Sequence, residues 1–243
     1  MSIYLKPDAT YTWNGVKVNY YYMTEHNPNK ISLPPKRSGD IIGVTVHNTN
    51  RITVSSKTTP AEQYLRATIN GNMNTVRVHL YVDSECAWLC LPLDYSSWHA
   101  GQSGKADRNG SGKGNGNTIS VEVIMDGSRD EEDIKARDNA ARLIAYLLKK
   151  YGGTLYTHNY WCNIRNGRKG TVDELNKLSD GYKGCPIYLR SEWDDFTALV
   201  NSYRFEKPAM YYVQVGAFSS KANAEAFLKS VKKDYPNAFI KTM

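Results

Sequence analysis

The sequence predicts an α/β protein, in which a mixed central β-sheet is flanked by helices and followed by a small C-terminal β-α-β unit. Short apolar runs rich in β-branched residues alternate along the chain with longer segments of helical periodicity. Such alternation is typical of strands and helices that share one core. The 243 residues have a hydrophobic content of 41%, which is enough for one good core and a small appendage.

Four apolar runs are predicted to be strands of the sheet. They are residues 41–47 (IIGVTVH), 76–82, 86–93 and 118–125. The second and third runs flank the short sequence DSE, as in a β-hairpin. Between the first two runs we predict a helix, because Thr59 can cap it, Pro60 suits its first position and Gly71 suits its exit.

The clearest helix is predicted from about Ser128 to Tyr151. Ser128 and Glu131 have the spacing of a capping box, and Gly152 follows the last turn. The predicted apolar face consists of residues at helical spacing: Ile134, Ala141, Leu143, Ile144, Leu147 and Leu148. A short strand, residues 154–158, is predicted to follow and to end in His158.

A last helix of the sheet domain is predicted at about 191–204. Ser191 would cap it, and its buried face would consist of Trp193, Phe196, Leu199, Val200 and Tyr203. Residues 108–117 are rich in glycine, but they lack a Gly-Lys-Ser/Thr sequence and precede a strand. We therefore predict a surface loop there rather than a phosphate site.

The remaining residues are predicted to form a linker, 204–209, and the β-α-β unit, 210–243. Within that unit we expect a strand at 211–218, a helix at 219–235 and a strand at 238–242.

The formal net charge of +7 favours polyanionic partners such as nucleic acid, an anionic membrane or an anionic cell wall. The sequence has no nucleic-acid-binding motif and no basic stripe interleaved with aromatic residues, so nucleic acid is not an expected partner. No apolar run approaches about 18 residues, so stable membrane insertion is not expected. The first residues lack the apolar core of a signal peptide, which predicts synthesis and retention in the cytoplasm.

Cys185 is unusual because it lies in a polar glycine turn, SDGYKGCPIYL, rather than in an apolar run. A disulfide, a reactive thiolate and a metal ligand are all open interpretations. Cys86 and Cys90 lie in one predicted strand, roughly 13 Å apart at about 3.3 Å per residue, which is too far for a disulfide. We interpret those two cysteines as buried side chains.

His47 and His158 both end predicted strands, and strand ends open onto the face where α/β proteins bind ligands. Two imidazoles and the Cys185 thiolate converging there would form a three-ligand zinc site that leaves the fourth position for water. Spacing alone leaves the alternative open that the three residues are unconnected polar side chains in loops.

Five motifs follow one another in the order, and at about the intervals, of a known family: VTVHNT, AWLCLPLDYSSWHAG, NTISVEVIM, YTH and YKGCP. The sequence thereby resembles the zinc-dependent N-acetylmuramoyl-L-alanine amidases of the amidase-2 family. That family includes phage and prophage endolysins and the peptidoglycan recognition proteins. The resemblance covers roughly residues 40–202 and implies that residues 1–203 form a catalytic domain with the fold of that family.

The resemblance implies one catalytic Zn²⁺, held by His47, His158 and Cys185. It also implies two catalytic residues. Glu122 matches the glutamate that accepts a proton from the attacking water, and Lys183 matches a lysine that faces the developing oxyanion.

Two further histidines match positions near the substrate. His99, in WHAG, matches a residue of the substrate groove, and His79 matches a strand histidine for which a hydrogen-bonded core position is an equal alternative.

The sequence departs from the family pattern in two places. Some members have a tyrosine where this sequence has Val78, so the role of the general base falls more heavily on Glu122. Residues 159–184 are longer than in many members and are expected to form an extra lobe beside the groove. Cys162, in this insert, is a rival ligand that lacks the Lys-x-Cys-Pro context.

The implied activity is hydrolysis of the amide bond between N-acetylmuramic acid and the L-alanine of the peptidoglycan stem peptide. The alternative is a non-catalytic peptidoglycan-recognition module, but members of that kind generally lose the cysteine ligand. The positive charge fits attraction to anionic wall polymers. The expected protein is a lysin made in the cytoplasm, which reaches the wall after holin-type release or cell lysis.

The segment YYVQVGAFSSKANAEAFLKSVKKDY resembles the opening of sporulation-related (SPOR) repeats, which bind peptidoglycan glycan strands. A complete SPOR domain has two β-α-β units, and residues 210–243 supply one. Its apolar face would be left uncovered, so we predict a two-fold homodimer through the same unit of a second chain. Docking on the sheet domain and a frayed tail are the alternatives.

Overall fold

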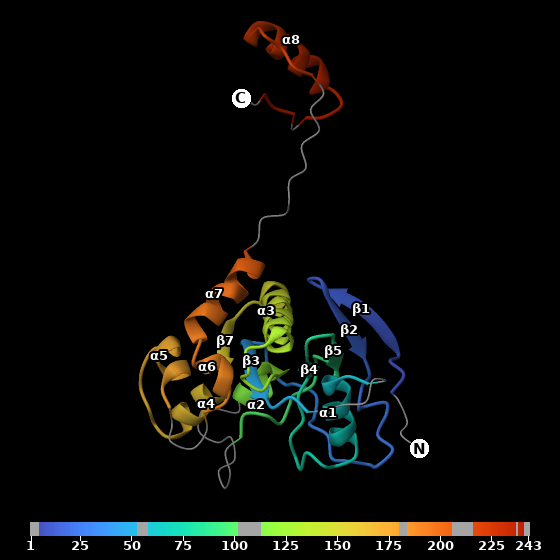
Figure 1. Cartoon of the computed structure of the whole chain (residues 1–243), viewed down its shortest axis with the longest axis vertical. Helices are drawn as coiled ribbons and strands as arrows, with labels where there is room; N and C mark the ends of the chain where they lie inside the picture. The colour runs from blue at the N-terminus through green and yellow to red at the C-terminus, as the bar shows by residue number, and fades with distance from the viewer. Residues whose placement is uncertain are drawn as a thin grey trace. The chain divides into compact units, whose positions relative to one another are not determined.

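The computed structural model describes residues 5–52, 58–101, 113–179, 184–205, 216–236 and 238–240. The chain divides into two compact units, residues 1–206 and 207–243. Within the first unit, the described strands form one sheet in the order β1-β2-β5-β4-β6-β3-β7, with helices packed against it (Figure 1). The predicted α/β class is confirmed.

The sheet combines parallel and antiparallel pairs. Its strands are β1 (Ala9–Trp13), β2 (Val16–Tyr20), β3 (Gly43–Thr49), β4 (Leu80–Val82), β5 (Ala87–Leu89), β6 (Thr118–Ile124) and β7 (Thr154–Thr157). β3 lies between β6 and β7 and is parallel to both. β4 and β5 form the predicted antiparallel hairpin, whereas the β1–β2 hairpin at the edge was not predicted.

Helices cover both faces of the sheet. Those of the first unit are α1 (Pro60–Ile69), α2 (Lys113–Asn117), α3 (Glu131–Tyr151), α4 (His158–Arg165), α5 (Val172–Lys177), α6 (Ile187–Arg190) and α7 (Trp193–Arg204). The larger core packs α3 and α7 against one face, where Val44 and Val46 of β3 are buried. Side chains alternate along a strand, so Thr45 and His47 point to the opposite face, which α1 covers in part.

The long helix α3 begins later than predicted. Its N-cap is Asp130, whose side chain accepts the N–H of Asp133 at 2.9 Å, so the predicted cap at Ser128 is wrong. Ile134, expected on the apolar face, is 59% exposed. The five other residues predicted for that face are buried.

The start of α7 also differs from the prediction. Glu192 occupies the N-cap position without a side-chain capping bond, so the predicted cap at Ser191 is wrong. Ser191 instead follows α6, and its hydroxyl donates to the carbonyl of Tyr188 at 2.8 Å.

The described part of the predicted extra lobe, residues 159–179, packs into the sheet domain. Trp161 of α4 is 3% exposed, and its Nε1 donates to Thr45 Oγ1 in β3 at 2.9 Å. Asn163 Nδ2 donates to the carbonyl of Leu175 at 2.9 Å and thereby joins α4 to α5. The described residues of the insert are therefore part of the first unit, and the extra lobe beside the groove stays a prediction.

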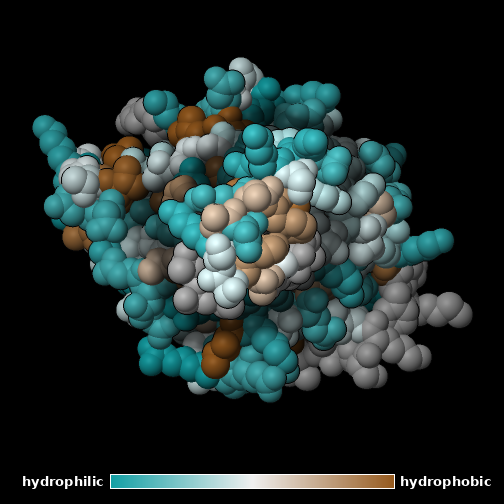
Figure 2. Space-filling view, turned by 90° about the horizontal axis from the view of Figure 1, so that it is seen from above, coloured by the Kyte–Doolittle hydropathy of each residue, from teal (hydrophilic) through white to brown (hydrophobic). Residues whose placement is uncertain are grey.

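The second unit contains α8 (Lys221–Val231), within the range predicted for its helix. The described residues of the two predicted strands, 216–218 and 238–240, are not in strands, and the other residues of those strands lie outside the described ones. No helix in the described part of the chain has the length and apolarity needed to cross a membrane. On the face that Figure 2 shows, hydrophilic residues predominate among the coloured ones, and hydrophobic residues form small patches.

Candidate functional site

A histidine–histidine–cysteine cluster forms on the face of the sheet opposite α3. One potential donor atom from each of His47, His158 and Cys185 lies within 4.8 Å of the others. Both histidines are 3% exposed, and Cys185 is half-buried. The structure therefore brings together the three residues for which spacing alone had left a scattered arrangement open.

Strand pairing and a helix cap place the two histidines side by side. β3 and β7 are parallel, with Val46 opposite Thr157, so the next residues, His47 and His158, lie side by side. His47 lies inside β3, which continues to Thr49, so its predicted place at the end of a strand is wrong. Thr157 ends β7 and caps α4, because its Oγ1 accepts the N–H of Tyr160 at 2.9 Å. His158 is thus the first residue of α4 rather than the last of a strand.

A backbone bond links the cysteine to this helix start. The N–H of Asn159 donates to the carbonyl of Cys185 at 3.0 Å. The first N–H groups of a helix have no partner within the helix, so this bond satisfies one of them and brings Cys185 next to His158.

Two backbone carbonyls determine which ring nitrogens carry hydrogen. A carbonyl oxygen only accepts, so His158 Nε2, at 2.8 Å from the carbonyl of Gly101, must be the protonated nitrogen. His99 Nε2 lies 3.0 Å from the carbonyl of Gly114 and is protonated for the same reason. In the neutral ring His99 Nδ1 is then an acceptor, and His47 Nε2 donates to it at 2.8 Å.

With these assignments Nδ1 is the unprotonated nitrogen of both His47 and His158, and an unprotonated ring nitrogen is the form that binds a metal. His47 Nδ1 lies 3.6 Å from Cys185 Sγ. A tetrahedral zinc ion, with Zn–N near 2.0–2.1 Å and Zn–S near 2.3 Å, would separate a nitrogen and a sulfur ligand by about 3.5 Å. The donor types and their spacing therefore fit zinc, and each histidine has the outer hydrogen bond typical of a metal ligand.

His99 lies deeper than the groove position that the family resemblance implies. It is 5% exposed, and both ring nitrogens are used by His47 and the carbonyl of Gly114. Burial and, to a smaller extent, repulsion from His158 lower the pKa of His99 to about 3, so the ring is neutral near pH 7. In this geometry His99 holds the Nε2 hydrogen of His47, and the substrate contact expected for His99 stays a prediction.

Glu122 lies next to His47 in the sheet. The two residues are paired in the β3–β6 register, so their side chains leave the same face. Val121 and Val123 are buried on the opposite face, in the α3 core. Glu122 is half-buried, and its charge helps to raise the pKa of the buried Tyr81 hydroxyl, after the larger effect of burial.

His79 belongs to the interior. It is fully buried, with Nδ1 at 3.0 Å from Ser120 Oγ and Nε2 at 3.1 Å from the carbonyl of Tyr95. These contacts agree with the core alternative rather than with a substrate contact.

Of the three other positions named from the sequence, two lie among the described residues. Lys183 lies outside the described residues. Cys162 is fully buried in α4, where Arg165 donates to its sulfur at 3.6 Å, and it is not part of the ligand cluster. Val78, where some family members have tyrosine, is fully buried in the core beneath α1.

The carbonyls of Gly101 and Gly114 are site groups that the sequence reasoning missed. Gly101 lies in the WHAG motif, so a signal existed for it. Gly114 belongs to α2, where only a surface loop was predicted. A Cβ at Gly114 would lie 2.7 Å from Ala100 Cβ, so only glycine lets this backbone approach His99.

Comparison with known proteins gives matches for both units. The family model described as N-acetylmuramoyl-L-alanine amidase matches residues 37–174, and the SPOR domain model matches residues 207–243. The N-acetylmuramoyl-L-alanine amidases XlyA and CwlH of Bacillus subtilis (strain 168) are 28% identical over 165 residues and 30% identical over 142 residues. These matches cover 66% and 57% of this chain and 51% of each relative, so the chain spans about half the length of these relatives. A solved mutant endolysin from Bacillus subtilis is 26% identical with a TM-score of 0.54, and the match covers 76% of this chain and 99% of that one.

Proposed function

Because the chain belongs to the N-acetylmuramoyl-L-alanine amidase family, we propose that it cleaves the amide bond between N-acetylmuramic acid and L-alanine in bacterial peptidoglycan. The observation that carries this proposal is the cluster of His47, His158 and Cys185 with Glu122 beside it on the same face of the sheet. Hydrolysis of an amide requires an activated water, a stabilised oxyanion and a proton for the leaving amine.

His47, His158 and Cys185 would hold one zinc ion through two Nδ1 atoms and a thiolate. Zinc bound there would polarise the scissile carbonyl and make a water nucleophilic near neutral pH. The Gly101 carbonyl and His99 would accept the Nε2 hydrogens of the two imidazoles and would so fix the tautomer and orientation in which Nδ1 binds a metal.

Glu122 is proposed as the group that moves protons. Its position beside His47 suits a carboxylate that takes a proton from the attacking water and then passes one to the alanine nitrogen. Lys183 keeps the role that the family resemblance implies, which is to face the developing oxyanion.

Digestion of purified cell wall tests this function. The wild-type protein with zinc should release free L-alanine amino termini without new reducing sugars, because the amide and not a glycosidic bond is cut. Cys185→Ser should lose zinc and activity. Glu122→Gln should keep zinc while the rate falls by about a hundredfold or more.

Cys162→Ser is the matched control, since it removes a buried cysteine outside the ligand cluster and should keep zinc. New reducing ends would identify a glycosidase instead. Binding to the wall without any new ends, by a zinc-loaded protein, would support a non-catalytic recognition module.

For the second unit we propose binding to peptidoglycan and self-association. The match to the SPOR domain supports the first part. The second part rests on exposed apolar side chains, since none of the residues of α8 is buried. Phe218 and Phe227 are 45% and 38% exposed, although their rings lie 5.2 Å apart. A second copy of the unit would cover this apolar surface, and anionic wall polymers would suit its positive charge.

A further inference from the structure

We propose that Asn48, the residue directly after His47, is a positioning residue that holds together the segments carrying His47, Glu122 and Cys185. The inference rests on the proposed zinc site. It assigns Asn48 no contact with metal or substrate. Its side chain leaves β3 on the face opposite His47, because successive residues of a strand alternate.

The Asn48 amide forms bonds to two other segments. Its Nδ2 donates to the carbonyls of Val123 and Met125, each at 3.1 Å, just after Glu122 in the chain. Its Oδ1 accepts the N–H of Tyr188, three residues after Cys185, at 3.2 Å. One side chain in β3 therefore spans the end of β6 and the start of α6.

The start of α6 needs this acceptor. The N-cap of α6 is Pro186, which has no side-chain acceptor, and no capping bond is formed within the segment. An uncapped helix start leaves N–H groups without partners. Asn48 supplies the missing acceptor where the chain passes from Cys185, on the site face, to Leu189, which is buried in the α3 core.

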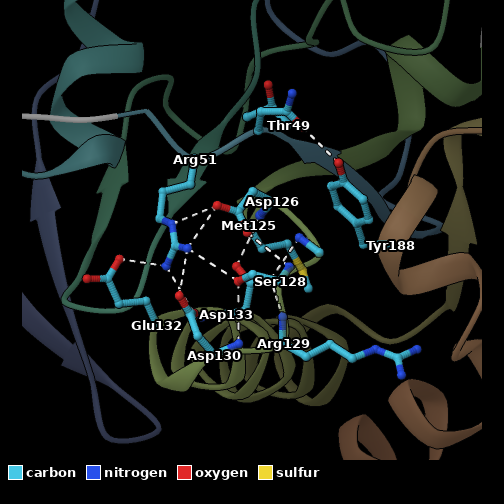
Figure 3. A network of polar contacts seen from close by, with 12 residues as sticks. Thr49, Arg51, Met125, Asp126, Ser128, Arg129, Asp130, Glu132, Asp133 and Tyr188 are labelled. Carbon is cyan, nitrogen blue, oxygen red and sulfur yellow. Dashed lines mark hydrogen bonds and ion pairs between the residues drawn. The ribbon is translucent and has the colours of Figure 1, made fainter.

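Other contacts join the same segments, and Figure 3 shows those of Arg51 and Tyr188. The Tyr188 hydroxyl donates to Asn50 Oδ1 at 3.1 Å. Arg51 donates to Asp126 at 2.8 Å and to Asp130 at 2.7 Å, which ties the segment after β3 to the segment after β6. Because His47 pairs with Glu122, the Arg51–Asp126 contact continues the same register four residues beyond the site.

Loss of the Asn48 amide should loosen Cys185 relative to His47 without removing any ligand. Asn48→Ala would remove the acceptor of the Tyr188 N–H and the amide donor to the carbonyls of Val123 and Met125. Asn48→Asp has the same shape and keeps the acceptor, but it turns an oxygen toward the carbonyls of Val123 and Met125. Both changes should lower zinc affinity, and outer contacts of metal sites are typically worth about 10- to 100-fold in affinity.

The test measures zinc affinity of the full chain by competition with a chromophoric chelator, and the absorption spectrum of the Co²⁺ form. We expect both Asn48 variants to bind zinc at least about tenfold more weakly than wild type and to have altered cobalt bands. Tyr188→Phe is the near control, because it keeps the backbone N–H that Asn48 accepts. Ile144→Val, a buried change on α3, is the control for general loss of stability.

The outcomes separate the two proposals. If wild type binds no zinc, the proposed function and this inference both fail. If wild type binds zinc and the Asn48 variants match Ile144→Val in affinity and cobalt spectrum, only the positioning role is overturned. It is also overturned if both Asn48 variants are unfolded without zinc while Ile144→Val is folded, since Asn48 would then serve folding.

Discussion

His79 is a fully buried residue that couples stability to pH. Burial, with a smaller repulsion from Arg37, lowers its pKa from the ordinary 6.5 to about 3. Between these values the unfolded chain binds a proton at this ring and the folded protein does not. The contribution of His79 to stability is therefore complete above about pH 6.5 and is lost as the pH falls toward 3.

Replacement of His79 should flatten this dependence. We expect wild type to lose about 2 kcal/mol of unfolding free energy through this residue between pH 7 and pH 5. His79→Asn, which can keep a polar contact to Ser120, should show that much less change when denaturant unfolding is measured at both pH values. Between pH 8 and 7 the two proteins should change in parallel. Equal acid sensitivity in both proteins would contradict the assignment.

At the scale of elements, the loop between β6 and α3 is packed against α6. Gly127 has φ +82°, and a Cβ there would lie 2.4 Å from the Tyr188 ring. Gly152, at the end of α3, has a similar φ of +76° but no neighbour within 4 Å of its Cβ position. Both glycines thus have a positive φ, but only Gly127 has a side chain packed against its Cβ position.

Alanine at each glycine separates these effects. Gly152→Ala should lower the unfolding free energy by about 1–3 kcal/mol, because its backbone, with φ +76° and ψ −163°, lies in a region that is nearly confined to glycine. Gly127→Ala should lower it by about 1–3 kcal/mol more, because the added methyl group displaces Tyr188. Denaturant unfolding of both variants at pH 7 measures the difference. Equal losses would show that the loop and α6 are not tightly packed.

Elements that bury a continuous apolar face could be predicted from the sequence, as β3, β6 and most of α3 were. The β1–β2 hairpin was missed, although its turn is Asn14-Gly15, both with positive φ, which is a strong local hairpin signal. The short helices α2 and α6 could not be predicted from periodicity. These helices are five and four residues long, and they depend on contacts with distant segments, such as the bond from the N–H of Tyr188 to Asn48.

In the site, too, local sequence patterns did not indicate contacts between distant segments. Cys185 and the two histidines that were predicted at strand ends could be grouped because each has a distinctive local context. The WHAG motif predicted that His99 lies near them. It did not indicate the hydrogen bond that His99 makes in the interior to the carbonyl of Gly114 in α2. Local sequence therefore indicated which residues gather, while the outer contacts that orient them came from tertiary packing.

At the scale of the whole molecule, the two units differ in how they bury apolar surface. The first unit has two cores of its own beneath its helices. The second keeps large apolar side chains exposed, among them Phe218 and Phe239 at 45% and 55%. Residues 207–243 also hold six lysines against one glutamate and one aspartate. Catalysis and attachment to the wall should therefore be separable.

A chain that ends at Glu206 should keep zinc binding and the cutting of soluble muropeptides, because the ligand cluster and both cores lie before this point. It should be monomeric by light scattering. The full chain should be dimeric, because a second copy would bury the exposed phenylalanines of the second unit. Only the full chain should sediment strongly with purified wall.

A Lys232→Gln/Lys233→Gln variant of the full chain should sediment less at low salt while keeping its dimer, because it removes charge next to α8 and leaves the phenylalanines. A full chain that stays monomeric at high concentration would refute the self-association, and equal sedimentation of full and shortened chains would refute the attachment role.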